Sequence, residues 1–394
     1  MRILHTVNIG FHAGGAEKST HLLALEQAAR GHEVRVVATD LLTPGPGQTV
    51  FADTLLPAMR GGPRRLVGSV WNQGVYRSVR SLVEEFRPDV VNHHTIGEFS
   101  PSIIAACRGR AQIMSAHGPE DWTLGLLRWN LPTATRPEGL SAADRLRYLR
   151  LRWVQRPAYR RQFHRVDRFI AVSRFMAETI AVDAGRIPVH VLPDCVEPGF
   201  GPRPVVNADR VLYSGRLERV KGVEHLIEAF RKTLTSHPSA RLAIAGEGTA
   251  RAGLEAAAAD LVAAGSVRFL GWLPREALAE QIAQSSLVVV PSVWPEVFGR
   301  VVLDAFDAGR AVIASRIGGL PELVDASRGL LVEPGDSDAL AAALAELLGD
   351  LPRLRRMGEA AQAFSEHYTI LRVVDKLEVH YEDAVAAVRN GRVG

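Results

Sequence analysis

Two carboxylates flank a Phe-Gly pair in the segment PSVWPEVFGRVVLDAF, residues 291–306, which follows a short apolar run. Glu296 precedes Phe298–Gly299 and Asp304 follows it. Carboxylates repel phosphate but accept hydrogen bonds from hydroxyls, which sugars and ribose supply. The Phe-Gly backbone can turn close to a ligand, and a helix that begins near Arg300 has free N–H groups at its start. The alternative is that Glu296 caps this helix and that Asp304 is simply exposed.

Two cations lie five positions apart in the loop sequence SGRLERVKG. Arg216 and Lys221 follow a predicted strand and stand between Gly215 and Gly222, where the next helix is expected to begin. A cation pair beside the positive end of a helix suits a diphosphate, because each charge-assisted hydrogen bond contributes about 1.5 to 3 kcal/mol. The alternative is a surface ion pair with Glu218.

Gly14 and Gly15 follow the first predicted strand, where a helix begins in GGAEKSTHLLALEQAARG. Backbone N–H groups without a neighbouring Cβ can approach a phosphate or a sugar at such a helix start, although a Gly pair is also common in an ordinary turn. The spacing of Leu22, Leu25 and Ala29 predicts the apolar face of this helix.

His117 follows another predicted strand and is succeeded by Gly118. The carboxyl ends of strands in α/β sheets are where ligands bind, so His117 is a candidate ligand contact. A structural histidine is the alternative.

Short β-branched runs alternate with helical patterns along the chain, which is typical of parallel sheets built from βαβ units. The strands predicted in the first half are residues 2–7, 33–39, 89–93, 112–116 and 168–172. Those predicted in the second half are residues 210–213, 241–245, 267–270, 287–290, 311–314 and 330–332. We therefore predict an α/β fold of two Rossmann-like, doubly wound domains with a ligand cleft between them.

Pro and Gly residues cluster where the two halves join, which makes a regular element there improbable. We predict an N-terminal domain over residues 1–195, a linker over 196–209 and a C-terminal domain over 210–368. A final helical segment spans residues 369–394.

The composition excludes several classes of protein. A chain of 394 residues that is 47% hydrophobic can bury a large core. Its two cysteines, Cys107 and Cys195, suggest neither a disulfide framework nor a zinc site. No stretch approaches the roughly 18 to 20 apolar residues that span a bilayer. A cytoplasmic protein is expected.

Positive charge is concentrated in the first half, where residues 1–195 carry 25 Lys and Arg against 17 Asp and Glu. Nine arginines lie within residues 145–168. In this segment Leu146, Leu149 and Trp153 follow helical spacing, and Pro157 is expected to end the helix. We expect this segment to guide an anionic or lipid-carried acceptor and to contact an anionic membrane peripherally. The arginines proposed for this role are Arg147, Arg150 and Arg152. The alternative is an ordinary helix that packs its apolar stripe on the domain core.

The chain resembles the retaining, nucleotide-sugar-dependent glycosyltransferases of family 4, which have the GT-B fold. The motifs that carry the resemblance occur in the same order as in that family, and they are the Gly14–Gly15 loop, His117, SGRLERVKG, IAGEG, VRFLGWLP, PSVWPEVFGRVVLDAF and GGLPELV. The resemblance implies that Gly15 lies near the donor phosphates and that Arg216 and Lys221 neutralise the diphosphate. It also implies that the final helix crosses back onto the N-terminal domain.

The remaining donor contacts also come from the resemblance. Glu296, with the amides of Phe298 and Gly299, would hold the hydroxyls of the donor sugar, and the second carboxylate would hold ribose. The candidate catalytic residues are His117, Arg216, Lys221 and Glu296. Leu270 and Gly271 would border the base. The candidate donor-binding residues are Gly14, Gly15, Gly215, Leu270, Gly271, Phe298, Gly299 and Asp304. The candidate acceptor or membrane residues are Arg147, Arg150, Arg152 and Trp153.

Two positions depart from the family pattern. Asp304 stands where the family usually has Glu, and Cys195 stands where Gly is common. The function that the resemblance implies is transfer of a hexosyl group, with retention, from a nucleotide diphosphate sugar to an acceptor hydroxyl, without a metal or other cofactor. A nucleotide-sugar epimerase of the same fold is the alternative enzyme, and a nucleic-acid-binding module is a further alternative that we do not favour.

Overall fold

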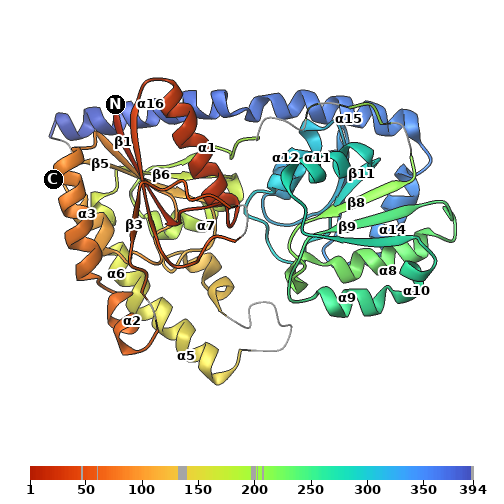
Figure 1. Cartoon of the computed structure of the whole chain (residues 1–394), viewed down its shortest axis with the longest axis horizontal. Coiled ribbons are helices and arrows are strands. Elements are labelled where there is room, and N and C mark those ends of the chain that lie inside the picture. The colour runs from red at the N-terminus through yellow and green to blue at the C-terminus, as the bar shows by residue number, and fades with distance from the viewer. Residues whose placement is uncertain are drawn as a thin grey trace. The chain divides into compact units, whose positions relative to one another are not determined.

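The structure is a computed structural model that describes residues 1–45, 48–59, 61–131, 140–196, 201, 203–205 and 208–391 (Figure 1). The chain divides into two compact units. Unit 1 comprises Met1–Cys195 and Ile370–Gly394, and unit 2 comprises Val196–Thr369. Each unit contains one parallel sheet with helices around it, so the predicted α/β class with two Rossmann-like sheets is confirmed.

The sheet of unit 1 has seven strands in the order β3-β2-β1-β4-β5-β6-β7. Its strands are β1 (Arg2–Ile9), β2 (Glu33–Thr39), β3 (Thr54–Leu56), β4 (Val90–His93), β5 (Ala111–Ala116), β6 (Arg168–Ala171) and β7 (Val189–Val191). The five predicted strands are present, and the sequence interpretation missed only the short edge strands β3 and β7. Every residue of β4 and β5 is buried, because helices cover both faces of a parallel sheet.

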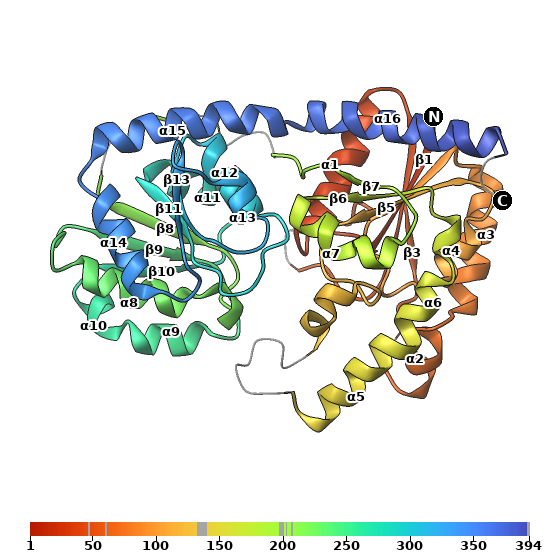
Figure 2. The same ribbon diagram turned by 180° about the vertical axis from the view of Figure 1, so that it is seen from behind.

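The helices of unit 1 include one from the far end of the chain. They are α1 (Gly15–Ala29), α2 (Pro63–Gly68), α3 (Gln73–Phe86), α4 (Ser102–Ala106), α5 (Ala142–Arg150), α6 (Arg156–Arg160), α7 (Arg174–Ala184) and α16 (Ile370–Arg389). Figure 2 shows α16 running past α1 and the sheet, and its buried residues, Val374 and Tyr381 among them, join strand residues such as Ile3 and Ile113 in one apolar core.

The buried face of α1 differs from the predicted one. Leu25 is 55% exposed, whereas Thr20, Leu23, Ala24 and Gln27 are buried. The prediction failed because it counted only apolar side chains. Thr20 donates to a backbone carbonyl within the helix and Gln27 Oε1 bonds a buried histidine, and these hydrogen bonds offset part of the cost of burying both polar side chains.

Unit 2 has six strands in the order β10-β9-β8-β11-β12-β13. They are β8 (Arg210–Ser214), β9 (Arg241–Ala245), β10 (Val267–Gly271), β11 (Leu287–Val290), β12 (Ala311–Ser315) and β13 (Gly329–Val332), all of which were predicted to within one residue. Its helices are α8 (Val223–Thr233), α9 (Arg251–Ala257), α10 (Ala259–Ala263), α11 (Arg275–Gln284), α12 (Arg300–Asp307), α13 (Leu320–Leu323), α14 (Ser337–Leu347) and α15 (Leu351–Ser365). One apolar cluster of unit 2 joins α8 and α14 to the sheet.

The loops at the carboxyl edge of this second sheet are in direct backbone-to-backbone contact. At Gly246, where φ is +142°, a Cβ would lie 1.8 Å from the carbonyl oxygen of Gly215. At Gly222, where φ is +65°, a Cβ would lie 2.1 Å from the carbonyl oxygen of Pro291. Neither position has room for a side chain, so these glycines let three loops converge on one edge.

We predict that Gly246→Ala lowers the free energy of unfolding by about 2 kcal/mol or more, because the Cβ must displace backbone and φ is unfavourable for alanine. The matched control is Gly253→Ala, which lies in α9 with nothing within 4 Å of its Cβ position. That substitution should be neutral or stabilising, by up to about 1 kcal/mol. Urea unfolding followed by circular dichroism measures both, and equal stabilities of the two variants would contradict the proposed close approach.

Candidate active site

The loop after β8 is fixed by hydrogen bonds to the loop after β9. Gly215 N–H donates to the carbonyl of Ala245 at 3.0 Å, and Leu217 N–H donates to that of Glu247 at 2.8 Å. A 3-10 turn, η4 (Arg219–Lys221), then leads into α8. Backbone hydrogen bonds therefore hold the start of the loop that carries the two predicted cations.

Lys221 and Glu296 form a direct pair. The Lys221 Nζ donates to Glu296 Oε1 at 2.6 Å, and each side chain is only 17% exposed. Ser292 Oγ donates to the same Oε1 at 2.6 Å. An ammonium has three N–H donors, so Lys221 can keep Glu296 and still reach a ligand oxygen.

Both alternatives considered for these charged residues are wrong. Glu218 accepts hydrogen bonds from the backbone and hydroxyl of Thr249, at 3.2 and 2.5 Å. The N-cap of α12 is Gly299, and no side chain caps that helix, so Glu296 is not a helix cap. Glu296 is instead oriented by Ser292 and by Gly319, whose N–H donates to its carbonyl at 2.7 Å.

Arg216 has an exposed guanidinium on an anchored backbone. The hydroxyl of the buried Tyr213 donates to the Arg216 carbonyl at 2.8 Å. Burial raises the pKa of Tyr213, so the phenol stays protonated and donates. The two cations thus differ, because Lys221 is tied to a carboxylate while Arg216 extends into solvent.

The other predicted donor residues of unit 2 lie along the same sheet edge. Leu270 and Gly271 end β10, and the Gly271 carbonyl accepts from Gly246 N–H at 2.7 Å. Phe298 is buried, and Asp304 is half-buried within α12. Because β10, β9, β8 and β11 are neighbours, these residues lie along adjacent strand ends of one sheet.

Gly14 and Gly15 stand at the start of α1, where Gly14 is the N-cap. The sequence interpretation missed Glu17, which is buried at this helix start, with its Oε2 3.0 Å from the Cβ position of Gly14. Burial raises the pKa of Glu17, and hydrogen bonds from the backbone of Glu17 and Gly14 partly offset this. A carboxyl group therefore already occupies the neighbourhood where a phosphate was expected.

His117 belongs to a chain of three imidazoles. Its Nε2 lies 2.8 Å from His94 Nδ1, and His94 Nε2 lies 2.8 Å from His5 Nδ1. His5 Nε2 in turn lies 2.8 Å from Gln27 Oε1. The sequence interpretation selected only His117. The sequence feature that could have identified His94 is its position directly after β4, the strand that pairs with both β1 and β5.

Burial keeps the inner histidines neutral. It lowers the pKa of His5 and of His93 to about 4, and lowers that of His94 well below its ordinary value, with the neighbouring histidines adding to the shift. His93 is satisfied separately, by Thr6 Oγ1 at 2.9 Å and Gln112 Oε1 at 3.1 Å.

We predict that the imidazoles of His5 and His93 stay neutral in the folded protein from about pH 7.5 down to about pH 5, whereas unfolded histidine takes up a proton near pH 6.5. Since the unfolded state then binds more protons, these two residues destabilise the fold as pH falls from about 6.5 towards 4. An NMR titration of histidine ring protons, with the urea-unfolded protein as reference, measures this. A midpoint near 6.5 for either ring would contradict it.

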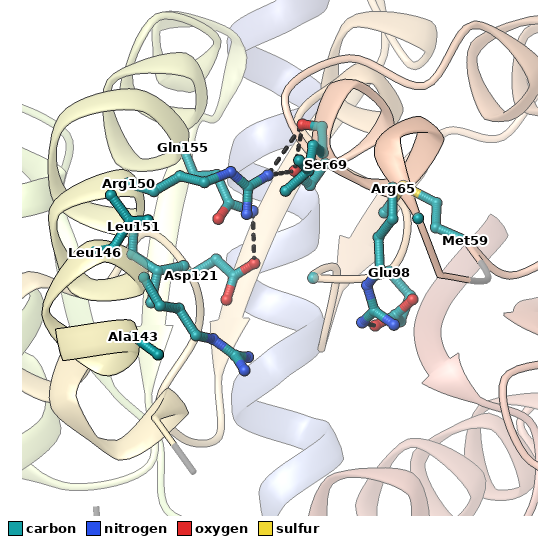
Figure 3. A pocket seen from close by; sticks show the side chains of 14 residues that line it. Met59, Arg65, Ser69, Glu98, Asp121, Ala143, Leu146, Arg150, Leu151 and Gln155 are labelled. Atoms are coloured by element: carbon teal, nitrogen blue, oxygen red, sulfur yellow. Dashed lines mark hydrogen bonds and ion pairs between the residues drawn. The ribbon is translucent and has the colours of Figure 1, made fainter. Parts of the chain in front are cut away.

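A cavity of about 580 Å³ lies within unit 1 between α5 and the α2 region (Figure 3). Its charged lining consists of Arg65, Glu98, Asp121, Arg147 and Arg150. Its apolar lining includes Met59, Leu66, Leu146 and Leu151. The cavity therefore combines an excess of cations with apolar surface.

Hydrogen bonds hold the polar lining in place. Arg150 Nη2 donates to the Leu66 carbonyl at 2.9 Å and also bonds Ser69 Oγ, while Gln155 Nε2 donates to Asp121 Oδ2 at 3.0 Å. In Figure 3 the side chains of Arg150 and Asp121 point toward one another. Burial raises the pKa of Asp121, and Arg147 and Arg150 partly oppose that shift.

The helix that carries these arginines corrects two expectations. Pro157 does not end it, because a π turn, η2 (Leu151–Gln155), joins α5 to α6 and the Arg156 N–H bonds the carbonyl five residues back. The wider turn accommodates the proline ring that an α-helix would exclude. The apolar stripe does not pack on the core either, since Leu146 is 70% and Trp153 67% exposed.

Arg152 and Trp153 lie outside the cavity lining. The Arg152 guanidinium stands 5.3 Å from the centre of the Trp153 ring, within cation–π range. Together with the exposed Leu149, they form an apolar and basic surface beside the cavity. Among the described residues, no helix is long and apolar enough to cross a membrane.

Comparison with known proteins identifies the family. Residues 13–200 match the model described as Glycosyltransferase Family 4, and residues 203–364 match that described as Glycosyl transferases group 1. The chain belongs to the family 4 glycosyltransferases, which have the GT-B fold.

Among curated relatives, an exopolysaccharide phosphotransferase of Streptomyces coelicolor is 33% identical over 216 residues, or 54% of this chain and 22% of that one. A D-inositol 3-phosphate glycosyltransferase of Corynebacterium kroppenstedtii is 33% identical over 197 residues, or 48% of this chain and 44% of that one. The matches thus span less than half the length of these relatives. Among solved structures, Anabaena HepE in complex with UDP and glucose has a TM-score of 0.69 at 19% identity, covering 97% of this chain and 99% of that one.

Proposed function

We propose that the protein transfers a hexosyl group from a nucleotide diphosphate sugar to an acceptor hydroxyl, with retention of configuration and without a metal. The observation that carries the proposal is the Lys221–Glu296 pair, set beside the exposed Arg216 at one sheet edge. In support, the related HepE was solved with UDP and glucose. A cation next to a carboxylate suits a donor that has a diphosphate joined to a hydroxyl-bearing sugar.

In this proposal each residue has one role. Arg216 and Lys221 stabilise negative charge on the leaving diphosphate, which a metal does in other enzymes. Glu296, oriented by Ser292, accepts hydrogen bonds from sugar hydroxyls with help from the backbone at Phe298 and Gly299. The remaining donor contacts are Asp304 with ribose, Leu270 and Gly271 with the base, Gly14 and Gly15 near the phosphates, and His117 with the sugar.

We predict that Arg216→Ala and Lys221→Ala each lower kcat/KM by about 30-fold to 1,000-fold, because each removes a charge-assisted contact made as the diphosphate leaves. Arg219→Ala is the matched control, since Arg219 is an exposed cation in the same loop. The donor is first chosen by a thermal-shift screen of nucleotide diphosphates and their sugars.

Transfer should continue in EDTA. Activity within about threefold of wild type for both variants would refute the diphosphate role, because a lost charged contact exceeds that factor. A strict requirement for Mg²⁺ or Mn²⁺ would refute the metal-free mechanism. Epimerisation of the donor in the absence of any acceptor would favour the epimerase.

For the acceptor, we propose an anionic molecule, glycan-like or lipid-linked, whose charged group enters the cavity of unit 1. Three arginines face two carboxylates there, and burial raises the pKa of both Glu98 and Asp121, so positive charge prevails. The adjoining surface of Leu149, Arg152 and Trp153 suits peripheral contact with the cytoplasmic face of an anionic membrane.

We predict that replacing Arg147, Arg150 and Arg152 together by Gln weakens sedimentation with anionic vesicles and raises the acceptor KM, because cations near the surface attract anionic headgroups. Donor hydrolysis and circular dichroism serve as controls for folding. A charge-matched control variant replaces three exposed arginines elsewhere in unit 1, namely Arg77, Arg108 and Arg186. If both triple variants lost the same amount of vesicle binding, the effect would come from net charge alone and not from this surface. Unchanged sedimentation and an unchanged acceptor KM would refute the proposal.

A further inference from the structure

A cavity of about 320 Å³ lies in unit 2, at the edge of the sheet opposite the candidate donor residues. It is lined by the starts of β8, β9 and β10 and by the end of α11. The candidate donor residues follow the other ends of these strands. Because β8 is five residues long, about 13 Å separates its two ends. The function proposed above does not use this cavity.

Strand register places three arginines of the cavity lining on one face of the sheet. Arg210 of β8 pairs directly with Arg241 of β9. Arg268 of β10 pairs with Ala243, which lies two residues beyond Arg241 and therefore on the same face. Leu242, at the position between them, belongs to the apolar cluster under α8 and α14 on the other face. All three arginines are exposed.

The lining carries positive charge without a compensating carboxylate, since it contains these three arginines and no Asp or Glu. Like charges on neighbouring strands repel one another. Within the described part of the chain, no carboxylate pairs with the guanidinium of Arg210 or of Arg268. Arg241 Nη1 donates to the carbonyls of Pro238 and Ala240, at 3.3 and 2.8 Å. An anion bound between the guanidiniums would relieve the repulsion.

The end of α11 does not oppose an anion, although the last carbonyls of a helix carry partial negative charge. The buried Arg310 donates to the carbonyls of Ile282 and Ala283, at 3.0 and 2.6 Å. Glu280, on the same helix, is paired with Arg203 at 2.8 Å. The charge of the lining arginines therefore dominates the cavity.

Two polar side chains of the lining are available to a ligand. Ser266 is only 8% exposed, and none of the described residues bonds its hydroxyl. The side-chain amide of Gln281, on α11, also has no partner among those residues. A buried polar group is usually satisfied by protein, water or a ligand. A hydroxyl and an amide both donate and accept, so they suit phosphate oxygens and ligand hydroxyls.

We propose that this cavity is a second ligand site, which binds a small soluble molecule that carries a phosphate group and hydroxyls, such as a sugar phosphate. The planar fork of a guanidinium matches phosphate oxygens. The volume lies near the lower end of the roughly 300 to 1,000 Å³ range of small-molecule sites. The site stands on these contacts and not on the proposed function.

The lining disfavours two larger anionic partners. It contains no aromatic side chain on which a nucleobase could stack. It also contains no exposed large apolar side chain that could enter a membrane interface. A polar ligand that fits within the cavity is the occupant that the lining matches.

Isothermal titration calorimetry of the full chain tests the site with three probes, namely inorganic phosphate, pyrophosphate and glucose 6-phosphate. We expect at least one probe to bind with a Kd below about 10 mM. Arg210→Gln combined with Arg268→Gln should weaken that binding by tenfold or more, because each lost charge-assisted contact contributes about a factor of ten. Both residues are exposed, so the fold should persist, which circular dichroism checks. Unchanged affinity in this double variant, or no binding of any probe, would overturn the proposal.

The matched control replaces Arg355 and Arg356 by Gln, because both are exposed arginines of α15 outside the cavity lining. It should bind the probe as wild type does, and an equal loss would overturn the site in favour of a net-charge effect. A variant with Arg216→Ala and Lys221→Ala should keep the binding. Loss of binding in that variant alone would place the probe at the candidate donor site and overturn a second site.

The other occupants are tested with vesicles that contain phosphatidic acid and with a single-stranded oligonucleotide. We expect neither to depend on Arg210 and Arg268. If either bound more tightly than the three probes and lost that binding in the double variant, the small-molecule assignment would be wrong.

Discussion

Main-chain contact between loops is the constraint on which unit 2 depends. The carboxyl ends of β8, β9 and β10 are joined by backbone hydrogen bonds that end on Ala245 and Gly271, and the end of β11 is joined to the β8 loop by Val293 N–H, which donates to Val220 at 3.0 Å. A side chain at Gly246 or at Gly222 would collide with a backbone carbonyl oxygen. The strand ends are thus set at fixed spacings before any side chain is considered, and Lys221 meets Glu296 as a result.

Unit 1 positions its candidate residue by a different means. His117 is held by a series of buried side chains, not by adjoining backbone. The rings of His5 and His94 join Gln27 to His117 through contacts of 2.8 Å each. The geometry of His117 therefore depends on α1 and β1 as much as on its own strand.

The sequence predicted the elements well where periodicity dominates, and less well where polar groups are buried. Strands such as Leu287–Val290 were visible because a continuous apolar run between turn residues has few other interpretations. The buried face of α1 was missed because Thr20 and Gln27 look solvent-exposed by composition. The role of Pro157 was misjudged because a π turn has no sequence signature comparable to that of a helix stop.

In the candidate site too, the sequence predicted residues in recognisable motifs and missed buried polar residues. Arg216, Lys221 and Glu296 were chosen from loop motifs, yet their types alone did not reveal that Lys221 and Glu296 bond each other. Glu17, His5 and His94 were not chosen, because a buried carboxyl and a histidine chain become evident only when strands distant in sequence are placed side by side.

The membership of α16 in unit 1 has a consequence for synthesis. A ribosome releases the seven strands of the first sheet long before residues 370–389, so the core site that Val374, Leu377 and Tyr381 will fill stays open while all of unit 2 emerges. During that interval the part of the apolar core that α16 covers in the folded protein is exposed, a state that favours chaperone binding or aggregation. A premature stop near residue 369 would leave unit 1 without part of its core while leaving the residues of unit 2 complete.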